Sequence, residues 1–172
     1  MKESALVYLD TCVVSALARE EKPTVDAIYG LLEFHKTGRV RVLTSSVTRD
    51  EIDKIPEEHR RRHSVIYNLL ADVSYIDQQR LLGFHSQWGP SGGVACPLIE
   101  DDAVWVRLHR MGLDRTDSYH VMLAVRNGCD VFLTCDERTI LNHRVEIEAA
   151  FPRIKLMQPS ELQILLASPE EH

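Results

Sequence analysis

The chain has 172 residues, of which 44% are hydrophobic, and its 20 basic and 26 acidic side chains give a formal net charge of −6. This composition is typical of a globular protein, and the length suits one domain, residues 1–172, with a core that needs no disulfide or metal support. The negative charge argues against a protein that grips nucleic acid over a broad basic surface. It does not exclude a nuclease, because a cluster of carboxylates that binds divalent cations is itself negative.

The lack of a recognisable targeting signal and the pattern of cysteines predict a cytoplasmic location. No apolar run reaches the roughly 18 residues that span a membrane, so no membrane partner is expected. The N-terminus passes directly into a strand-like run without a signal-peptide cleavage site, which predicts a cytoplasmic protein. The four cysteines, at positions 12, 96, 129 and 135, form no C-x-x-C pair, and we expect them to be reduced.

The first half of the chain alternates strand and helix patterns. Residues 5–9, ALVYL, are a continuous apolar run that ends at Asp10, which is typical of a strand buried in a parallel sheet. A helical stretch follows, and apolar positions at helical spacing predict a second helix over residues 24–35. Residues 40–43 predict the next strand, and residues 44–46, TSS, form an N-cap cluster for another helix.

That third helix carries an acidic side chain in an unexpected place. Val47, Ile52 and Ile55 define its apolar face, and Glu51 falls inside the same arc. A carboxylate on a buried stripe requires a partner, for which a metal ion and an arginine are both candidates.

The second half continues the alternation. Its predicted elements are a helix over residues 56–71, an irregular region over 72–99, a helix opened by the acids at 100–102, a helix over 116–127 ended by Gly128, a strand over 131–133, a strand over 154–156 and a helix over 160–167. Strands that alternate with helices predict an α/β fold, a three-layer α/β/α sandwich with a central, mostly parallel sheet.

Four acids are expected to meet at one edge of that sheet. Asp10 and Asp136 follow apolar strands, and sites in open parallel sheets form beyond the carboxyl ends of the strands. Asp117 lies in the first turn of a helix that runs antiparallel to the strand before Asp136, so this helix begins at the same edge. With Glu51, four carboxylates can converge although they are spread over the whole chain.

Each acid also has a structural interpretation. Asp10 could cap the first helix, and Asp136 could begin the turn that follows its strand. Asp117 could belong to a helix cap begun by Asp114, and Glu51 could pair with an arginine. Their common placement at one edge favours a functional site.

The chemistry of such a cluster follows from its charge. Oxygen-only ligands suit hard cations such as Mg²⁺ or Mn²⁺, which keep water molecules and bind phosphate oxygens. Such ions orient a water for in-line attack on a phosphodiester and neutralise the charge that develops.

Four short motifs in this order resemble those of the PIN-domain family of metal-dependent nucleases. YLDT at residues 8–11 is similar to the first motif, and SSVTRDEIDKI at 45–55, with Ser45, Ser46 and Glu51, to the second. The third and fourth motifs are matched by GL at 112–113, DSYH at 117–120, GCD at 128–130 and LTCD at 133–136. One departure is Cys12, which stands where many members carry asparagine.

The resemblance implies a role for each matched residue. The metal ligands and catalytic residues would be Asp10, Glu51, Asp117 and Asp136. Thr11 and Thr134 would hydrogen-bond to these acids. Candidate RNA contacts are His120 and the basic run Arg60, Arg61 and Arg62, for which helix packing and a solvated helix face are the structural alternatives.

The implied function is a Mg²⁺- or Mn²⁺-dependent endoribonuclease that cuts single-stranded RNA with a metal-activated water. The family includes toxins of type II toxin–antitoxin pairs, so an antitoxin protein and a second copy of the chain are candidate partners besides RNA. Two alternatives stay open. One is a catalytically weak PIN-like protein with an RNA-binding or regulatory role. The other is a haloacid-dehalogenase-like phosphatase, which needs an aspartate two residues after Asp10, where Cys12 stands.

Overall fold

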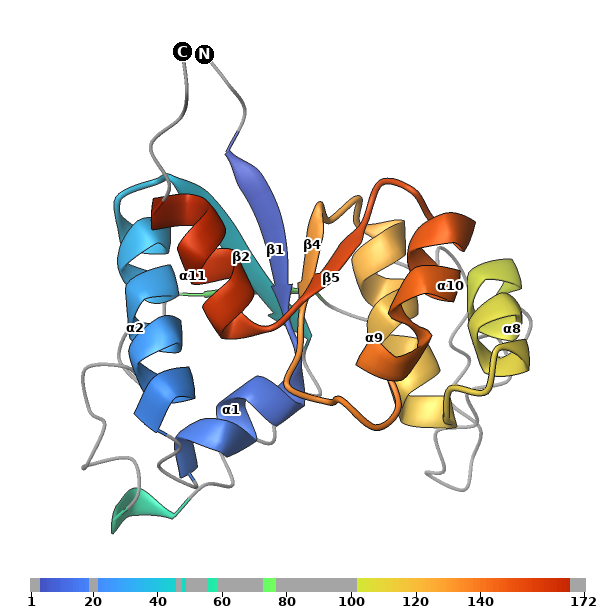
Figure 1. The fold of residues 1–172 in the computed structure, drawn as a ribbon, viewed down its shortest axis with the longest axis horizontal. Helices are drawn as coiled ribbons and strands as arrows, with labels where there is room; N and C mark the ends of the chain where they lie inside the picture. The colour runs from blue at the N-terminus through green and yellow to red at the C-terminus, as the bar shows by residue number, and fades with distance from the viewer. Residues whose placement is uncertain are drawn as a thin grey trace, which may run out of the picture.

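The computed structural model describes residues 4–18, 22–45, 48, 56–58, 73–76 and 102–167 (Figure 1). In chain order the elements are β1 (Ala5–Leu9), α1 (Thr11–Ala18), α2 (Lys22–Lys36), β2 (Val40–Ser45), β3 (Ser74–Ile76), α8 (Ala103–Arg110), α9 (Arg115–Arg126), β4 (Val131–Leu133), the 3₁₀ helix η1 (Leu141–His143), α10 (Arg144–Ala150), β5 (Lys155–Met157) and α11 (Pro159–Ala167). Glu51, Arg60, Arg61, Arg62 and Cys96 lie outside the described residues.

The described strands form a five-stranded sheet with the order β3-β2-β1-β4-β5, and every neighbouring pair is parallel. β1 lies at the centre, where Val7 pairs with Val42 on one side and with Val131 on the other. A strand with neighbours on both sides and helices on both faces has no polar face, which explains the continuous apolar run ALVYL.

The side chains of β1 alternate between two hydrophobic cores. Val7 and Leu9 join the core beneath α1, α2 and α11, whereas Tyr8 joins the core beneath α8, α9 and α10. Figure 1 shows these two groups of helices on opposite sides of the sheet. All three side chains are 0% exposed, and each such burial contributes about 1.5–3 kcal/mol. The predicted α/β/α sandwich with a parallel sheet is confirmed.

The local predictions agree closely with the structure. The first strand has the predicted bounds. The helix predicted to open at the acids 100–102 is α8, in which Asp102 is the N-cap rather than a first-turn acid and accepts the backbone N–H groups of Val104 and Trp105. Gly128 follows α9 with φ +66°. Positive φ favours glycine at that position.

The remaining local predictions have mixed outcomes. Thr44 and Ser45 end β2, and the Ser45 hydroxyl accepts the backbone N–H of Thr48, which is the contact expected of the predicted N-cap cluster. β3 is unpredicted, since three residues are too few to show a strand periodicity. The helices expected after Ser46 and over residues 56–71 lie outside the described residues, except for residue 48 and residues 56–58. No helix in the described ranges is long and apolar enough to cross a bilayer.

Candidate functional site

The carboxyl ends of β1 and β4 bring the first and last predicted acids to one edge. Asp10 directly follows β1 and Asp136 follows β4, and these strands are parallel neighbours. The Asp10 backbone N–H donates to the Leu133 carbonyl over 3.0 Å, which extends the strand pairing to the first acid. The chain leaves β1 and β4 toward opposite halves of the sheet, so this edge is the switch point at which open α/β sheets form binding sites.

The Asp10 carboxylate is held in place by three donors. Its Oδ1 accepts the backbone N–H of Thr11 over 2.8 Å, and its Oδ2 accepts the Thr134 hydroxyl and the Cys12 thiol, each over 2.9 Å. The residue is 5% exposed. A carboxylate with this many donors has a fixed orientation, which a ligand site requires.

Thr134 connects Asp10 with Asp136. Its hydroxyl donates to Asp10 and accepts the backbone N–H of Asp136 over 3.1 Å, and the side chain is 0% exposed. The predicted supporting role of Thr134 agrees with these contacts. Thr11 contacts Asp10 through its backbone only, because its hydroxyl lies 2.9 Å from the Thr48 hydroxyl.

The start of α9 distinguishes Asp114 from Asp117. Asp114 is the N-cap, and its Oδ1 accepts the backbone N–H of Asp117 over 2.8 Å. The carboxylate of Asp117 turns elsewhere, since its Oδ2 accepts the Thr139 hydroxyl over 2.8 Å. Asp114 therefore performs the capping role, and the carboxylate of Asp117 is directed toward the loop that follows β4.

Asp136 both forms a turn and faces Asp117 across one hydroxyl. Its Oδ1 accepts the backbone N–H groups of Arg138 and Thr139, over 2.9 and 3.0 Å, so the structural interpretation of this acid is correct for one oxygen. Its Oδ2 contacts the Thr139 hydroxyl. Burial raises the pKa of Asp136, but the hydrogen bonds from Thr139 and Arg138 outweigh burial, and the net pKa is lowered.

The Thr139 hydroxyl thus contacts the carboxylates of both Asp117 and Asp136. A hydroxyl carries one proton and can donate to only one acceptor at a time. Two ionised carboxylates around it leave an excess of acceptors, which a further proton or a cation relieves. The pair is arranged to take up positive charge.

The pKa of Asp117 reports the same excess of negative charge. Burial raises it, and the charges of Asp114, Asp136 and Asp10 raise it further, while the hydrogen bond from Thr139 lowers it. The net direction is upward. Two other predicted acids, Asp10 and Asp136, therefore act electrostatically on the carboxylate of Asp117.

The donor chemistry fits a hard divalent cation, because Thr139 and the two acids that its hydroxyl contacts offer hydroxyl and carboxylate oxygens. In the part of the chain that the structure describes, no three histidine, cysteine, aspartate or glutamate side chains form a group that could hold a metal ion by themselves. The described acids supply a pair, Asp117 and Asp136, with Asp10 beside it. The fourth predicted ligand, Glu51, lies outside the described residues.

His120 lies in the core rather than at the acidic edge. It is 2% exposed, and its Nδ1 is 2.8 Å from the hydroxyl of Tyr8, which is fully buried. Burial raises the pKa of Tyr8 well above its ordinary value, so the phenol stays protonated. These contacts support the helix-packing role of His120, which ties α9 to β1.

Sequence reasoning missed two side chains at this edge. Thr139 had a usable signal, because it stands three residues after Asp136, the spacing at which an Asp side chain meets a backbone N–H in a capping turn. Cys12 had a weaker signal, its place in the first motif two residues after Asp10, which does not indicate a thiol that donates to Asp10 and accepts the backbone N–H of Cys135.

Comparisons with known proteins leave the family open. No protein-family model matches the sequence, and no curated protein matches it significantly. Among solved structures, the chain is similar to the one described as "Crystal structure of PAE2754 from Pyrobaculum aerophilum", with a TM-score of 0.47 and 13% sequence identity over 98% of this chain and 95% of that chain. A likeness at this level identifies neither a family nor an activity.

Proposed function

We propose that this protein is a metal-dependent nuclease that hydrolyses phosphodiester bonds of single-stranded RNA with Mg²⁺ or Mn²⁺. One observation carries the proposal: the Thr139 hydroxyl brings the carboxylates of Asp117 and Asp136 together at the sheet edge where Asp10 ends β1. The PIN-like order of motifs supports the choice of substrate.

The acids at the edge would have different roles in binding the cation. Asp117 and Asp136 would hold the cation with the oxygens that face Thr139, and Asp10 would add charge from a position fixed by Thr134 and Cys12. Glu51 would complete the ligand set. A bound divalent cation supplies a water molecule that is more easily deprotonated and neutralises charge on the scissile phosphate.

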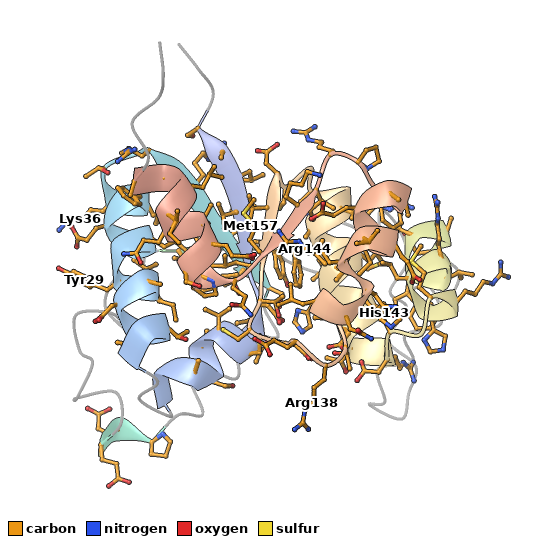
Figure 2. All side chains as sticks on the ribbon, in the orientation of Figure 1. Tyr29, Lys36, Arg138, His143, Arg144 and Met157 are labelled. Atoms are coloured by element: carbon orange, nitrogen blue, oxygen red, sulfur yellow. The ribbon has the colours of Figure 1, made fainter. Side chains whose placement is uncertain are left out.

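Arg138 offers a positive charge beside the acids. Its charge lowers the pKa of Asp136, and Figure 2 shows the side chain projecting outward from the loop after β4. An exposed guanidinium at the rim of the site can contact an RNA phosphate bidentately. We infer that Arg138 positions the RNA backbone, a role for which the run of arginines at residues 60–62 is a second candidate.

The test is an RNA cleavage assay with end-labelled single-stranded RNA in Mn²⁺ or in chelator. We expect cleavage by the wild-type chain in Mn²⁺ only, and a loss of about 10²-fold or more for Asp10→Asn and Asp136→Asn. Asp136→Asn keeps an oxygen for the turn, so it removes charge rather than structure. Metal-dependent cleavage that survives both substitutions would overturn the proposal.

Asp130→Asn is the matched control. Asp130 precedes β4 at the opposite edge of the sheet, where its Oδ2 accepts the backbone N–H of Leu6 over 2.9 Å. This substitution also neutralises an acid beside β4 but leaves the site intact, so cleavage should be retained.

A second candidate function is RNA binding without catalysis. The observation in its favour is that the described acids form no three-residue metal group. Intact RNA binding together with failure to bind Mn²⁺ in a calorimetric titration would select it.

An antitoxin partner and a homodimer are proposals that rest on the family resemblance, and co-expression with the product of an adjacent short gene tests the first of them.

A further inference from the structure

Two cysteines meet at the acidic edge. Cys12 lies in the first turn of α1 and Cys135 between β4 and Asp136, so they follow strands that pair at Leu9 and Leu133. The Cys135 backbone N–H donates to Cys12 Sγ over 2.9 Å. Because a backbone nitrogen and Cβ share one Cα, the Cys12 sulfur lies next to the base of the Cys135 side chain.

The surroundings of this pair are compatible with a covalent link. Both residues are partly exposed, so a small oxidant can reach them. The parallel pairing of Leu9 with Leu133 brings the segments that carry Cys12 and Cys135 side by side, and a disulfide needs such proximity. Cys129, by contrast, lies two residues before β4, is 1% exposed and packs in the core beneath α9.

We propose that Cys12 and Cys135 form a reversible disulfide that regulates the acidic site. The regulatory half of this inference rests on the proposed function, whereas the disulfide does not. In the reduced state Cys12 donates its S–H to Asp10 Oδ2 over 2.9 Å and contacts the Thr134 hydroxyl over 3.0 Å. The Cys12 thiol is thus part of the support of the first predicted ligand.

The oxidation balances with one molecule of a small disulfide such as oxidised glutathione. One cysteine sulfur attacks a glutathione sulfur and releases one reduced glutathione, leaving a mixed disulfide. The other cysteine sulfur attacks that mixed disulfide, which closes the Cys12–Cys135 bond and releases the second reduced glutathione. The two protein thiol protons leave on the two glutathione thiols.

Exchange between the protein thiols and a small disulfide is expected over minutes to hours when no enzyme catalyses it.

The disulfide would disturb the support of Asp10. A disulfide sulfur has no S–H to donate, and it must lie about 2.05 Å from its partner sulfur, so Cys12 Sγ leaves its present contacts. The peptide of Cys135, which precedes Asp136, must adjust as well. Loss of supporting hydrogen bonds typically lowers metal affinity about 10–100-fold, and the oxidised chain should bind Mn²⁺ correspondingly more weakly.

The first experiment maps the disulfide in the full chain. After incubation with oxidised glutathione and digestion with trypsin under non-reducing conditions, we expect peptide 3–19 linked to peptide 127–138. Because the second peptide contains two cysteines, Cys129→Ala is the matched control and should keep the link, whereas Cys12→Ser and Cys135→Ser should lose it. Absence of the linked peptide, or its loss in Cys129→Ala, would overturn the inference.

The second experiment measures Mn²⁺ binding by calorimetry to the reduced, oxidised and re-reduced chain. We expect the Mn²⁺ affinity to fall by about tenfold or more after oxidation and to recover after reduction. Equal affinity in the two states would overturn the regulatory role. Absence of Mn²⁺ binding in every state would overturn the proposed function together with that role, while a mapped disulfide would still stand.

Discussion

At the scale of single residues, the arrangement around Thr139 decides what the acidic edge can do. One carboxylate oxygen of Asp136 accepts a backbone N–H of its own turn, and the other contacts the Thr139 hydroxyl. One carboxylate oxygen of Asp117 accepts the same hydroxyl. One proton between two carboxylates leaves negative charge uncompensated. The hydroxyl therefore holds the pair in a geometry that a cation would stabilise.

Removing that hydroxyl should weaken cation binding without unfolding the chain. Thr139→Val keeps the side-chain shape and the backbone N–H that Asp136 accepts, so the turn remains. We expect about a 10–100-fold loss of Mn²⁺ affinity by isothermal titration calorimetry, as for other residues that orient metal ligands. Thr139→Ser retains the hydroxyl and should stay near the wild-type value. Unchanged affinity in Thr139→Val would show that the hydroxyl does not position the pair.

The raised pKa of Asp117 predicts a pH-dependent cost in the metal-free chain. A carboxyl whose native pKa lies above its ordinary value of 3.8 contributes stability below that value and loses it as pH rises through the native pKa. Asp117→Asn removes the ionised form, so in chelator it should be more stable than wild type at pH 7. The advantage should shrink as pH falls toward 3.8.

Urea unfolding in chelator between pH 4 and pH 7 measures this effect. Asp26→Asn, an exposed acid on α2, is the control and should show little change at either pH. A wild-type chain as stable as Asp117→Asn at pH 7 would contradict the prediction.

At the scale of elements, the first turn of α9 separates a structural acid from a functional one. Asp114 caps the helix, while Asp117, the third residue of α9, faces the loop after β4. α9 runs back along the sheet from this edge, because Gly128 turns the chain into β4. The same helix is anchored in the core by the contact between His120 and Tyr8.

Substitutions at Asp114 should affect stability and leave the cation site largely intact. Asp114→Ala removes the acceptor for the Asp117 backbone N–H and should cost about 1 kcal/mol, the usual value of an N-cap. Asp114→Ser restores a capping oxygen, so most of the stability should return. Chemical unfolding and Mn²⁺ titration of both variants check the separation. A loss of Mn²⁺ binding in Asp114→Ser as large as that in Asp117→Ala would refute it.

At the scale of the whole molecule, the acidic edge is assembled from distant parts of the chain. Asp10 comes from the end of β1, Asp117 from α9 and Asp136 from the loop after β4, and the parallel pairing of β1 with β4 brings them to one place. The unfolded chain cannot reproduce this arrangement. A cation that binds here therefore binds the native state only.

Mn²⁺ should consequently stabilise the entire fold. At a free concentration of 100 times Kd, native-state binding adds about 2.7 kcal/mol, which corresponds to a rise of about 5–11 °C in Tm for a chain of this size. Thermal unfolding with Mn²⁺ and with chelator measures the shift. Asp136→Asn, which keeps an oxygen for its turn, should show little or none of it. An equal shift in that variant would place the bound ion elsewhere.

The sequence by itself determined the features that depend on neighbouring residues. The apolar run of β1, the start of a helix at the acids 100–102, and Gly128 after α9 are local in origin, because hydrophobic periodicity, helix-end preferences and positive φ act within a few residues. Together they predicted the parallel α/β fold and the edge at which Asp10 and Asp136 end their strands.

Only the tertiary structure decided the contacts between segments that are distant in sequence. The shared hydroxyl of Thr139, the thiol of Cys12 beside Cys135, and the burial of His120 against Tyr8 depend on side-chain directions after the sheet has closed. Sequence spacing does not specify those directions, since packing against other elements selects the rotamers. For this reason the acids at the edge could be predicted, whereas the sharing of the Thr139 hydroxyl by two of them and the contact of the Cys12 thiol with Cys135 could not.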